Sequence, residues 1–87
     1  MSYRLIIKPS AEKELGHLPR DIARRVVDRL ATLPDNPRPA GAVMLAESKN
    51  TYRVRIGDYR IVYQVDDAAQ TVFVTIIAHR REVYRGL

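Results

Sequence analysis

The segment TYRVRIGDYRIVYQV, residues 51–65, constrains the fold more than any other part of this 87-residue chain. Apolar and polar side chains alternate on both sides of the Gly-Asp pair at 57–58, which is the pattern of two half-buried strands joined by a two-residue turn. A turn of that length predicts that Arg55 lies directly opposite Arg60. One face of the hairpin is therefore expected to be apolar, and the other to carry arginines.

Arginines at 53, 55 and 60 occupy the polar side of this hairpin, and neither strand contains an Asp or a Glu. Two like charges directly across a strand pair are mildly destabilising, so Arg55 opposite Arg60 brings no stability. A bound anion would reverse the sign of that interaction. The alternative is that the arginines only solvate the open face of a half-buried sheet. The lack of any interspersed carboxylate favours an anion-binding face.

The rest of the sequence predicts one small α+β domain spanning residues 1–87. Two helical segments precede the hairpin, and the second carries apolar residues at 22, 26, 30 and 33, with helical spacing. Such a stripe must cover an apolar surface, which the hairpin provides. The expected elements are a strand over 3–8, helices over 10–18 (with Ser10 as N-cap) and 20–33, a brief edge strand over 43–46, and strands over 51–56, 59–65 and 71–78.

Composition excludes several classes of protein. With 46% hydrophobic and 29% charged residues, the chain is globular and not disordered. It has no cysteine, which excludes disulfides, thiolate metal sites and a cysteine nucleophile. No apolar run approaches the roughly 20 residues of a membrane span, and the N-terminal stretch lacks the apolar centre of a signal peptide. A cytosolic protein without membrane attachment is therefore expected.

The net charge of +5 favours an anionic partner such as nucleic acid. There is no glycine-rich phosphate loop and no pair of carboxylates on one element. The two histidines, His17 and His79, are too isolated to suggest a metal site. We therefore expect neither a cofactor nor a bound metal.

The third strand of the meander ends near His79, and Arg80, Arg81 and Tyr84 follow at once. Cations that hold a phosphate, a group that titrates near neutral pH and a ring that stacks on a base are the parts needed to cut RNA. A lone histidine at a strand end can equally be a surface residue, and Tyr84 can equally anchor the C-terminal segment. If 67–70 form a four-residue loop, the residues expected on the arginine face are Phe73, Thr75, Ile77 and His79.

The motifs GDYRIVYQV and HRREVY, with the order strand, two helices and antiparallel meander, resemble the RelE branch of the RelE/ParE superfamily of bacterial toxins from type II toxin-antitoxin modules. The resemblance covers nearly the whole chain. It implies a two-layer α+β fold, in which two N-terminal helices pack on one face of an antiparallel sheet of four to five strands. It also implies a metal-independent endonuclease that cuts mRNA in the ribosomal A site by attack of a ribose 2′-hydroxyl on the adjacent phosphate. A cognate antitoxin, which wraps the toxin and often forms a heterotetramer with it, is the implied protein partner.

The resemblance also implies roles for single residues. Arg60 matches the phosphate-contacting arginine of the family, and Arg80 matches its transition-state arginine. Tyr84 matches the tyrosine that packs against the cleaved nucleotide.

Arg53 and Arg55 stand where well-known members of the family carry lysines, one of which is assigned as general base. The pKa of arginine, above about 12, makes it a very poor proton acceptor. His79 is therefore the candidate general acid or base. The residues expected to bind RNA are Arg53, Arg55, Arg81 and Lys49.

Two other functions stay open at this point. The same fold in its ParE-like form inhibits DNA gyrase by binding, without nuclease chemistry. An inactive module that only docks RNA or an antitoxin is the second, because arginines replace the lysines. Cleaved ribosome-associated mRNA, gyrase-linked DNA breaks, and intact RNA bound with a strong salt dependence would distinguish the three.

Overall fold

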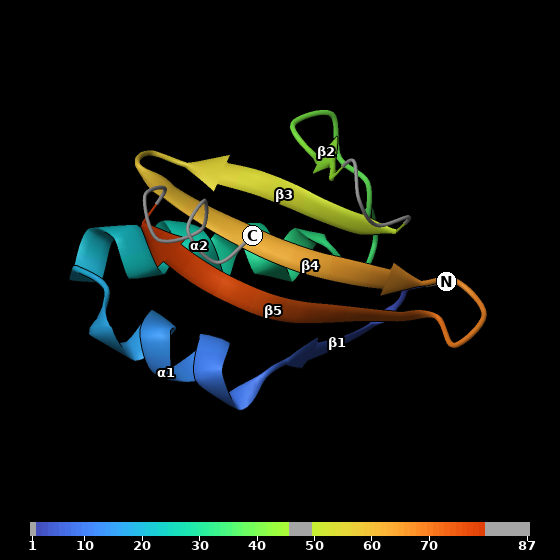
Figure 1. The fold of residues 1–87 in the computed structure, drawn as a ribbon, viewed down its shortest axis with the longest axis horizontal. Helices are drawn as coiled ribbons and strands as arrows, with labels where there is room; N and C mark the ends of the chain where they lie inside the picture. Colours follow the sequence, from blue (N-terminus) through green and yellow to red (C-terminus); the bar gives the residue numbers. More distant parts are fainter. Residues whose placement is uncertain (1, 46–49, 80–87) are drawn as a thin grey trace.

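The computed structural model describes residues 2–45 and 50–79. Two helices lie against one face of a five-stranded sheet, so the expected two-layer α+β architecture is confirmed for these residues (Figure 1). No helix in these residues is both long and apolar enough to cross a bilayer. The elements in chain order are β1 (Arg4–Ile7), α1 (Pro9–His17), α2 (Arg20–Thr32), β2 (Val43–Met44), β3 (Thr51–Ile56), β4 (Tyr59–Asp66) and β5 (Thr71–His79).

The strand order is β1-β5-β4-β3-β2. The pairs from β2 to β5 are antiparallel, as the resemblance implied for the sheet. β1 instead pairs parallel with β5, so the sheet is mixed. A parallel partner cannot follow through a tight turn, and both helices and the other three strands lie between β1 and β5 in sequence.

The β3–β4 hairpin has the predicted register, with Val54 opposite Ile61 and Arg55 opposite Arg60. Gly57, the first of the two turn residues, has a φ of 58°. A positive φ at that position is the pattern of a type II′ turn, whose twist matches that of the flanking strands. The turn therefore fixes which side chains share a face.

Replacing Gly57 with Ala should lower the free energy of unfolding by about 1–2 kcal/mol, because a Cβ is disfavoured at positive φ. Gly16, in α1, is the matched control, since a Cβ added there would meet no atom within 4 Å. Gly16→Ala should raise the free energy of unfolding by up to about 1 kcal/mol through its better helix propensity. Urea unfolding measures both, and a neutral Gly57→Ala would contradict the turn geometry.

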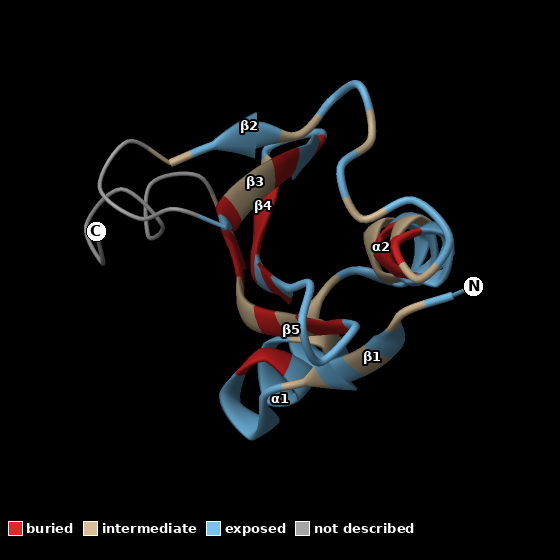
Figure 2. Ribbon diagram, turned by 90° about the vertical axis from the view of Figure 1, so that its right-hand side faces the viewer, coloured by how far each residue is buried: buried red, intermediate tan, exposed pale blue. Residues whose placement is uncertain are grey.

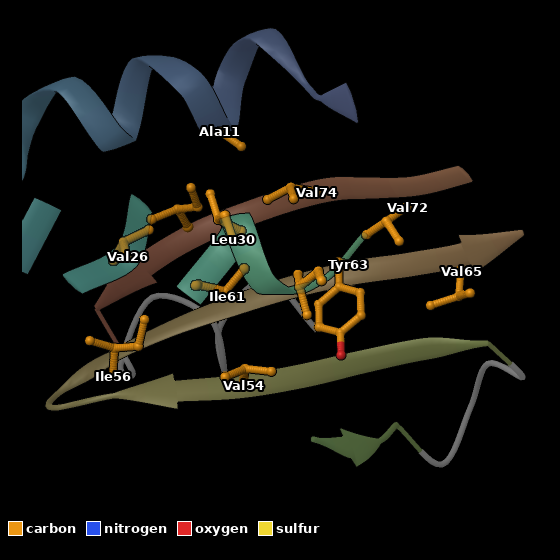
Figure 3. Close-up of a cluster of buried hydrophobic side chains, with 12 residues drawn as sticks. Ala11, Val26, Leu30, Val54, Ile56, Ile61, Tyr63, Val65, Val72 and Val74 are labelled. Carbon is orange, nitrogen blue, oxygen red and sulfur yellow. The ribbon is translucent and has the colours of Figure 1, made fainter. Parts of the chain in front are cut away.

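The hydrophobic core lies between the helices and the sheet (Figure 3). α2 contributes Val26 and Leu30, and Leu33 at its C-cap is also buried, as the apolar stripe predicted. α1 adds Ala11. Figure 2 shows the buried residues of α1 and α2 on the sides of these helices that face the sheet. The strand residues of this core are Val54, Ile56, Ile61, Tyr63, Val65, Val72, Val74 and Ile77.

The start of α1 differs from the expectation. The helix begins at Pro9, and Lys8 is its N-cap without a side-chain hydrogen bond, so the prediction of Ser10 as N-cap is wrong. Proline is well suited to the first helical position because its missing N–H would have no partner there. Ser10 consequently lies within the first turn.

β5 contains a β-bulge that the sequence did not predict. Tyr63 is paired with Val74 but Val62 with Ile76, so Thr75 is an extra residue in β5. The Thr75 hydroxyl donates a hydrogen bond to the carbonyl oxygen of Val62, at 3.2 Å. An extra residue reverses the alternation of the side chains beyond it.

The bulge changes the face of the residues that follow it. Ile77 pairs with Ile61 and is buried in the core beneath the helices. His79 pairs with Tyr59, on the same side of the sheet. The expectation that Ile77 and His79 lie on the arginine face is therefore wrong, and Ile76 takes that face instead.

Candidate functional site

The arginine face is the side of the sheet turned away from α1 and α2, and it carries Arg53, Arg55 and Arg60. The register places all three on one side, as predicted, with Arg53 opposite Val62 and Arg55 opposite Arg60. Their exposure differs, because Arg55 is exposed and Arg53 half-buried, whereas only 4% of Arg60 is exposed. The face thus grades from a solvated cation on β3 to a buried one on β4.

A small apolar cluster adjoins Arg60 on this face. Val62 and Ala78 are buried, and Leu45 and Ile76 pack against them. Ala78 is the β5 residue directly opposite Arg60. Charges interact more strongly in such surroundings than in water. A charge-assisted hydrogen bond to a phosphate oxygen is stronger in such surroundings than in water.

His79 lies on the other side of the sheet. Its ring meets the ring of Tyr59 edge-on, with centroids 5.5 Å apart and an interplanar angle of 82°. Tyr59 in turn pairs with the core residue Ile56. The bulge at Thr75 thus separates His79 from the arginines with which the sequence had grouped it.

The other predicted site residues cannot be placed in the same way. Lys49, Arg80, Arg81 and Tyr84 lie outside the described residues. Their roles stay predictions. Within the described residues, no group of three or more His, Cys, Asp or Glu side chains is arranged to hold a metal ion.

A hollow of about 540 Å³ lies at the far end of the arginine face, beside the β4–β5 turn. Gln64 and Phe73 lie opposite each other in its wall. Asp66 and Asp67 make this end acidic. An amide and an aromatic ring are groups that contact the edge and the face of a base, whereas the carboxylates disfavour a phosphate.

A hydrogen-bonded network holds the proline-rich connector between α2 and β2, residues 34–41, near this end on the helix side. The Arg38 guanidinium forms a bidentate ion pair with Asp67, with Nη2 at 2.8 Å from Oδ2 and Nη1 at 3.1 Å from Oδ1. Arg38 Nε donates to the Tyr52 hydroxyl at 2.7 Å, and the Tyr3 hydroxyl donates to Asp67 Oδ1 at 2.7 Å. Arg38 is thus a structural cation on the surface, and each of its three nitrogens donates to a side chain of the protein.

Tyr63 extends this network into the core. Its ring stacks on that of Tyr52, with centroids 5.8 Å apart, and its hydroxyl donates to the carbonyl oxygen of Pro37 at 2.7 Å. Burial, and to a lesser degree the neighbouring Tyr52, raises the pKa of Tyr63 to about 12. Tyr63 is therefore a neutral hydrogen-bond donor throughout the physiological range.

Comparison with known proteins identifies the family. Residues 5–84 match the ParE toxin family of type II toxin-antitoxin systems, parDE. The chain is 31% identical to Toxin RelG of Mycobacterium tuberculosis over 86 residues, covering 98% of this chain and 99% of that toxin. It is 33% identical to Toxin RelE of the same organism over 84 residues, covering 95% and 87%. The chain belongs to the RelE branch of the RelE/ParE toxin superfamily.

The fold of this RelE-branch toxin agrees with that assignment. It superimposes on the RelE–RelB complex of Pyrococcus horikoshii with a TM-score of 0.82 and 28% identity, covering 92% of this chain and 97% of the matched one. The likeness includes the helices and the sheet, so it supports the arrangement that positions the arginine face. This chain is thus a RelE-like toxin of a type II toxin-antitoxin module.

Asp67 of this RelE-branch toxin should make its stability depend on pH. Hydrogen bonds from Arg38, and then from Tyr3, lower the pKa of Asp67. A carboxyl whose pKa falls on folding stabilises the protein above its unfolded pKa of about 3.9, and this contribution is lost as the pH falls through the folded pKa. Wild type should therefore be more stable than Asp67→Asn at pH 7, and the difference should shrink below about pH 4.

Urea unfolding between pH 3 and 7 measures this difference. Asp35→Asn is the matched control, because Asp35 is an exposed connector residue and the change in charge is the same. A difference between wild type and Asp67→Asn that stays constant over the whole range would contradict the role of the Arg38–Asp67 ion pair.

Proposed function

We propose that this toxin cuts mRNA in the ribosomal A site and so inhibits translation. The observation that carries the proposal is the set of three arginines on one sheet face, with Arg55 opposite Arg60 in a strand pair that holds no carboxylate before Asp66. Like charges in that position repel each other and oppose folding. A bound polyanion would pair with these arginines, so their charge would favour binding. The relatives named as RelE and RelG toxins support the same branch of the family.

The proposed reaction needs only groups that RNA and the protein supply. The 2′-oxygen of a ribose forms a bond to the adjacent phosphorus, the bond from phosphorus to the 5′-oxygen breaks, and the proton of the 2′-hydroxyl ends on the departing 5′-oxygen. Negative charge builds up on the pentacoordinate phosphorus. Arg60 would stabilise that charge from its buried position, and Arg80 is proposed as its partner from the resemblance to the family.

The remaining residues would hold the substrate. Arg53 and Arg55 are assigned to the RNA backbone, because guanidiniums bind phosphates but do not accept protons. Tyr84 is proposed to pack on a nucleotide, and Arg81 and Lys49 to bind the backbone, in each case from the sequence. No proton transfer is assigned to His79, because its side chain lies on the opposite side of the sheet from Arg60.

We also propose an antitoxin as the inhibitory partner. The Pyrococcus horikoshii relative was solved as a complex with RelB. A net charge of +5 suits an acidic chain that covers the arginine face. Such a chain would block the site by occupying the arginines that RNA needs.

Incubating the purified toxin with programmed ribosomes and, separately, with free RNA tests the proposed cleavage. Mapping the 5′ ends of the products should show cuts in the A-site codon of ribosome-bound mRNA. Intact mRNA in both reactions, together with gyrase-linked DNA breaks in cells, would establish the ParE-like activity instead. RNA that is bound but intact in both would show a binding module without chemistry.

A further inference from the structure

A second basic site lies on the helix side of the β3–β4 hairpin. It is a cleft of about 430 Å³ between α2 and β3, which we term the α2 cleft. Figure 2 looks along α2 and shows this helix beside the sheet. The cleft is lined by Arg25, Asp28, Arg29, Thr32, Arg55 and Ile56.

The positions of Arg25 and Arg29 follow from their neighbours. Arg25 Nη1 lies 3.8 Å from where a Cβ of Gly57 would be, so this guanidinium lies beside the β3–β4 turn. Arg29 Nη2 lies 2.9 Å from where a Cβ of Gly41 would be, so its guanidinium lies against the connector backbone. Four residues apart on α2, the two share one helix face.

The charge of the α2 cleft is not balanced by its own residues. Two arginines and one aspartate of α2 line it, together with Arg55 of β3, whose side chain the register places on the arginine face. Arg29 Nε is buried and has no hydrogen-bond partner among the described residues. The Thr32 hydroxyl donates to the Arg29 carbonyl oxygen at 2.7 Å and is not an acceptor for this Nε. A buried donor without an acceptor is unfavourable, and an oxyanion in the cleft would supply acceptors for this guanidinium.

Arg55 connects the α2 cleft to the arginine face. It is the β3 residue paired with Arg60, and it also lines the cleft. Cations therefore continue from the sheet, past the Gly57 turn, to α2. Such a continuous track fits a linear polyanion better than a single carboxylate, and guanidiniums match the geometry of phosphate oxygens.

We propose that the α2 cleft binds a backbone phosphodiester of the RNA, so that the bound strand passes around the end of the β3–β4 hairpin. The inference rests on the proposed function, since it takes RNA as the substrate. Arg25 and Arg29 would share one phosphate, and Arg55 would link it to the phosphates on the arginine face. The cleft thus adds a binding subsite remote from the bond that is cut.

Fluorescence anisotropy with a labelled single-stranded RNA tests the proposal. The double variant Arg25→Gln, Arg29→Gln keeps the helix propensity of α2 but removes two charges. Its affinity at 50 mM salt should fall about tenfold, as expected for the loss of a charged hydrogen-bonded contact. The slope of log affinity against log salt should become shallower by about 0.7, the value for one phosphate of a single strand.

Arg24→Gln is the matched control, because Arg24 is exposed on α2 and does not line the cleft. The double variant removes two charges and the control one, so twice the loss of affinity measured for Arg24→Gln is the loss expected from net charge alone. A double variant that changes affinity and slope no more than that would overturn the proposal. A variant that binds RNA normally but binds purified antitoxin more weakly would overturn it too, since the cleft would then hold an acidic protein segment.

If the double variant does not fold, Gly41→Ala tests whether the α2 cleft binds RNA. The added Cβ would lie 2.9 Å from Arg29 Nη2 and would displace that guanidinium without removing its charge. At least a threefold loss of RNA affinity supports the proposal, and unchanged affinity overturns it. Binding that depends on the cleft, in a toxin that cuts no mRNA on ribosomes, would leave this inference standing and reject the proposed cleavage.

Discussion

Arg60→Ala should lower the rate of mRNA cleavage on programmed ribosomes about a hundredfold. Arg60 is the most deeply buried of the three arginines on the arginine face, with 4% of its surface exposed. Removing one donor that stabilises transition-state charge in such a site costs about 3 kcal/mol, and each 1.36 kcal/mol is a factor of ten in rate. Single-turnover cleavage measures the effect, and growth arrest on expression should weaken in parallel.

Three comparison variants show whether charge, geometry or folding is responsible. Arg24→Ala removes the same charge from the exposed surface of α2 and should leave cleavage within about twofold. Arg60→Lys keeps a charge but loses the planar fork, so its rate should lie between wild type and Arg60→Ala. His79→Gln should cleave at nearly the wild-type rate, because His79 contacts Tyr59 on the helix side.

Thermal unfolding must accompany these rates, because Arg60 is a buried residue. A folded Arg60→Ala that cuts mRNA at the wild-type rate would show that the arginine face is not the reaction site. A large loss of cleavage in a folded His79→Gln would show that His79 reaches the substrate despite its position. The two results are independent, so each tests a different part of the proposed mechanism.

The hairpin was predictable because two local signals agree. The alternation over 51–65 requires one apolar face, and the Gly57 turn permits only one register. A slip of one residue would bury Arg55 and expose Val54. Local rules therefore determine the part of the sheet that carries the three arginines.

The sequence of β5 contains no comparable signal for its bulge. The stretch VFVTIIA, residues 72–78, is apolar at nearly every position, so either alternation puts apolar side chains on both faces. The extra residue, Thr75, decides whether Ile76 or Ile77 enters the core, and both are isoleucine. The bulge changes the chemistry of the two faces only at His79, because the other residues that change face are apolar.

Contacts between segments distant in the sequence could not be predicted from it either. Arg38 and Asp67 are 29 positions apart, in a connector and a turn, and no spacing rule links them. The α2 cleft depends on where Gly41 and Gly57 pass the arginines of α2, which is a property of the tertiary structure. The sequence showed Arg25 and Arg29 only as charges four residues apart on a helix.

Ile61→Ala should lower the free energy of unfolding by about 2–5 kcal/mol, the usual loss for a buried isoleucine. Ile61 has no exposed surface and lies on β4 opposite Val54 of β3 (Figure 3). On its other side it pairs with Ile77 of β5. A domain of 87 residues has a stability of about 4–13 kcal/mol, so this single change removes a large share of it. Urea unfolding with a constant m-value would measure the loss.

Two substitutions on β4 bracket this effect. Ile61→Val removes one methyl group and should cost about 0.5–1.5 kcal/mol. Gln64→Ala, at an exposed residue of the arginine face, should change the stability by at most about 0.5 kcal/mol. An Ile61→Ala protein as stable as Gln64→Ala would mean that the helices do not cover this face of the sheet.

Substitutions at two neighbouring residues of β4 should therefore impair the toxin in different ways. Ile61→Ala should lose toxicity together with folded protein, and conditions that restore folding should restore the cleavage rate per folded molecule. Arg60→Ala should lose cleavage per folded molecule under all conditions, because what it lacks is charge at the phosphate. Normalising single-turnover rates to the folded fraction separates the two. A normalised rate for Ile61→Ala as low as that of Arg60→Ala would place Ile61 in the reaction site and contradict the division of the sheet into a core face and an arginine face.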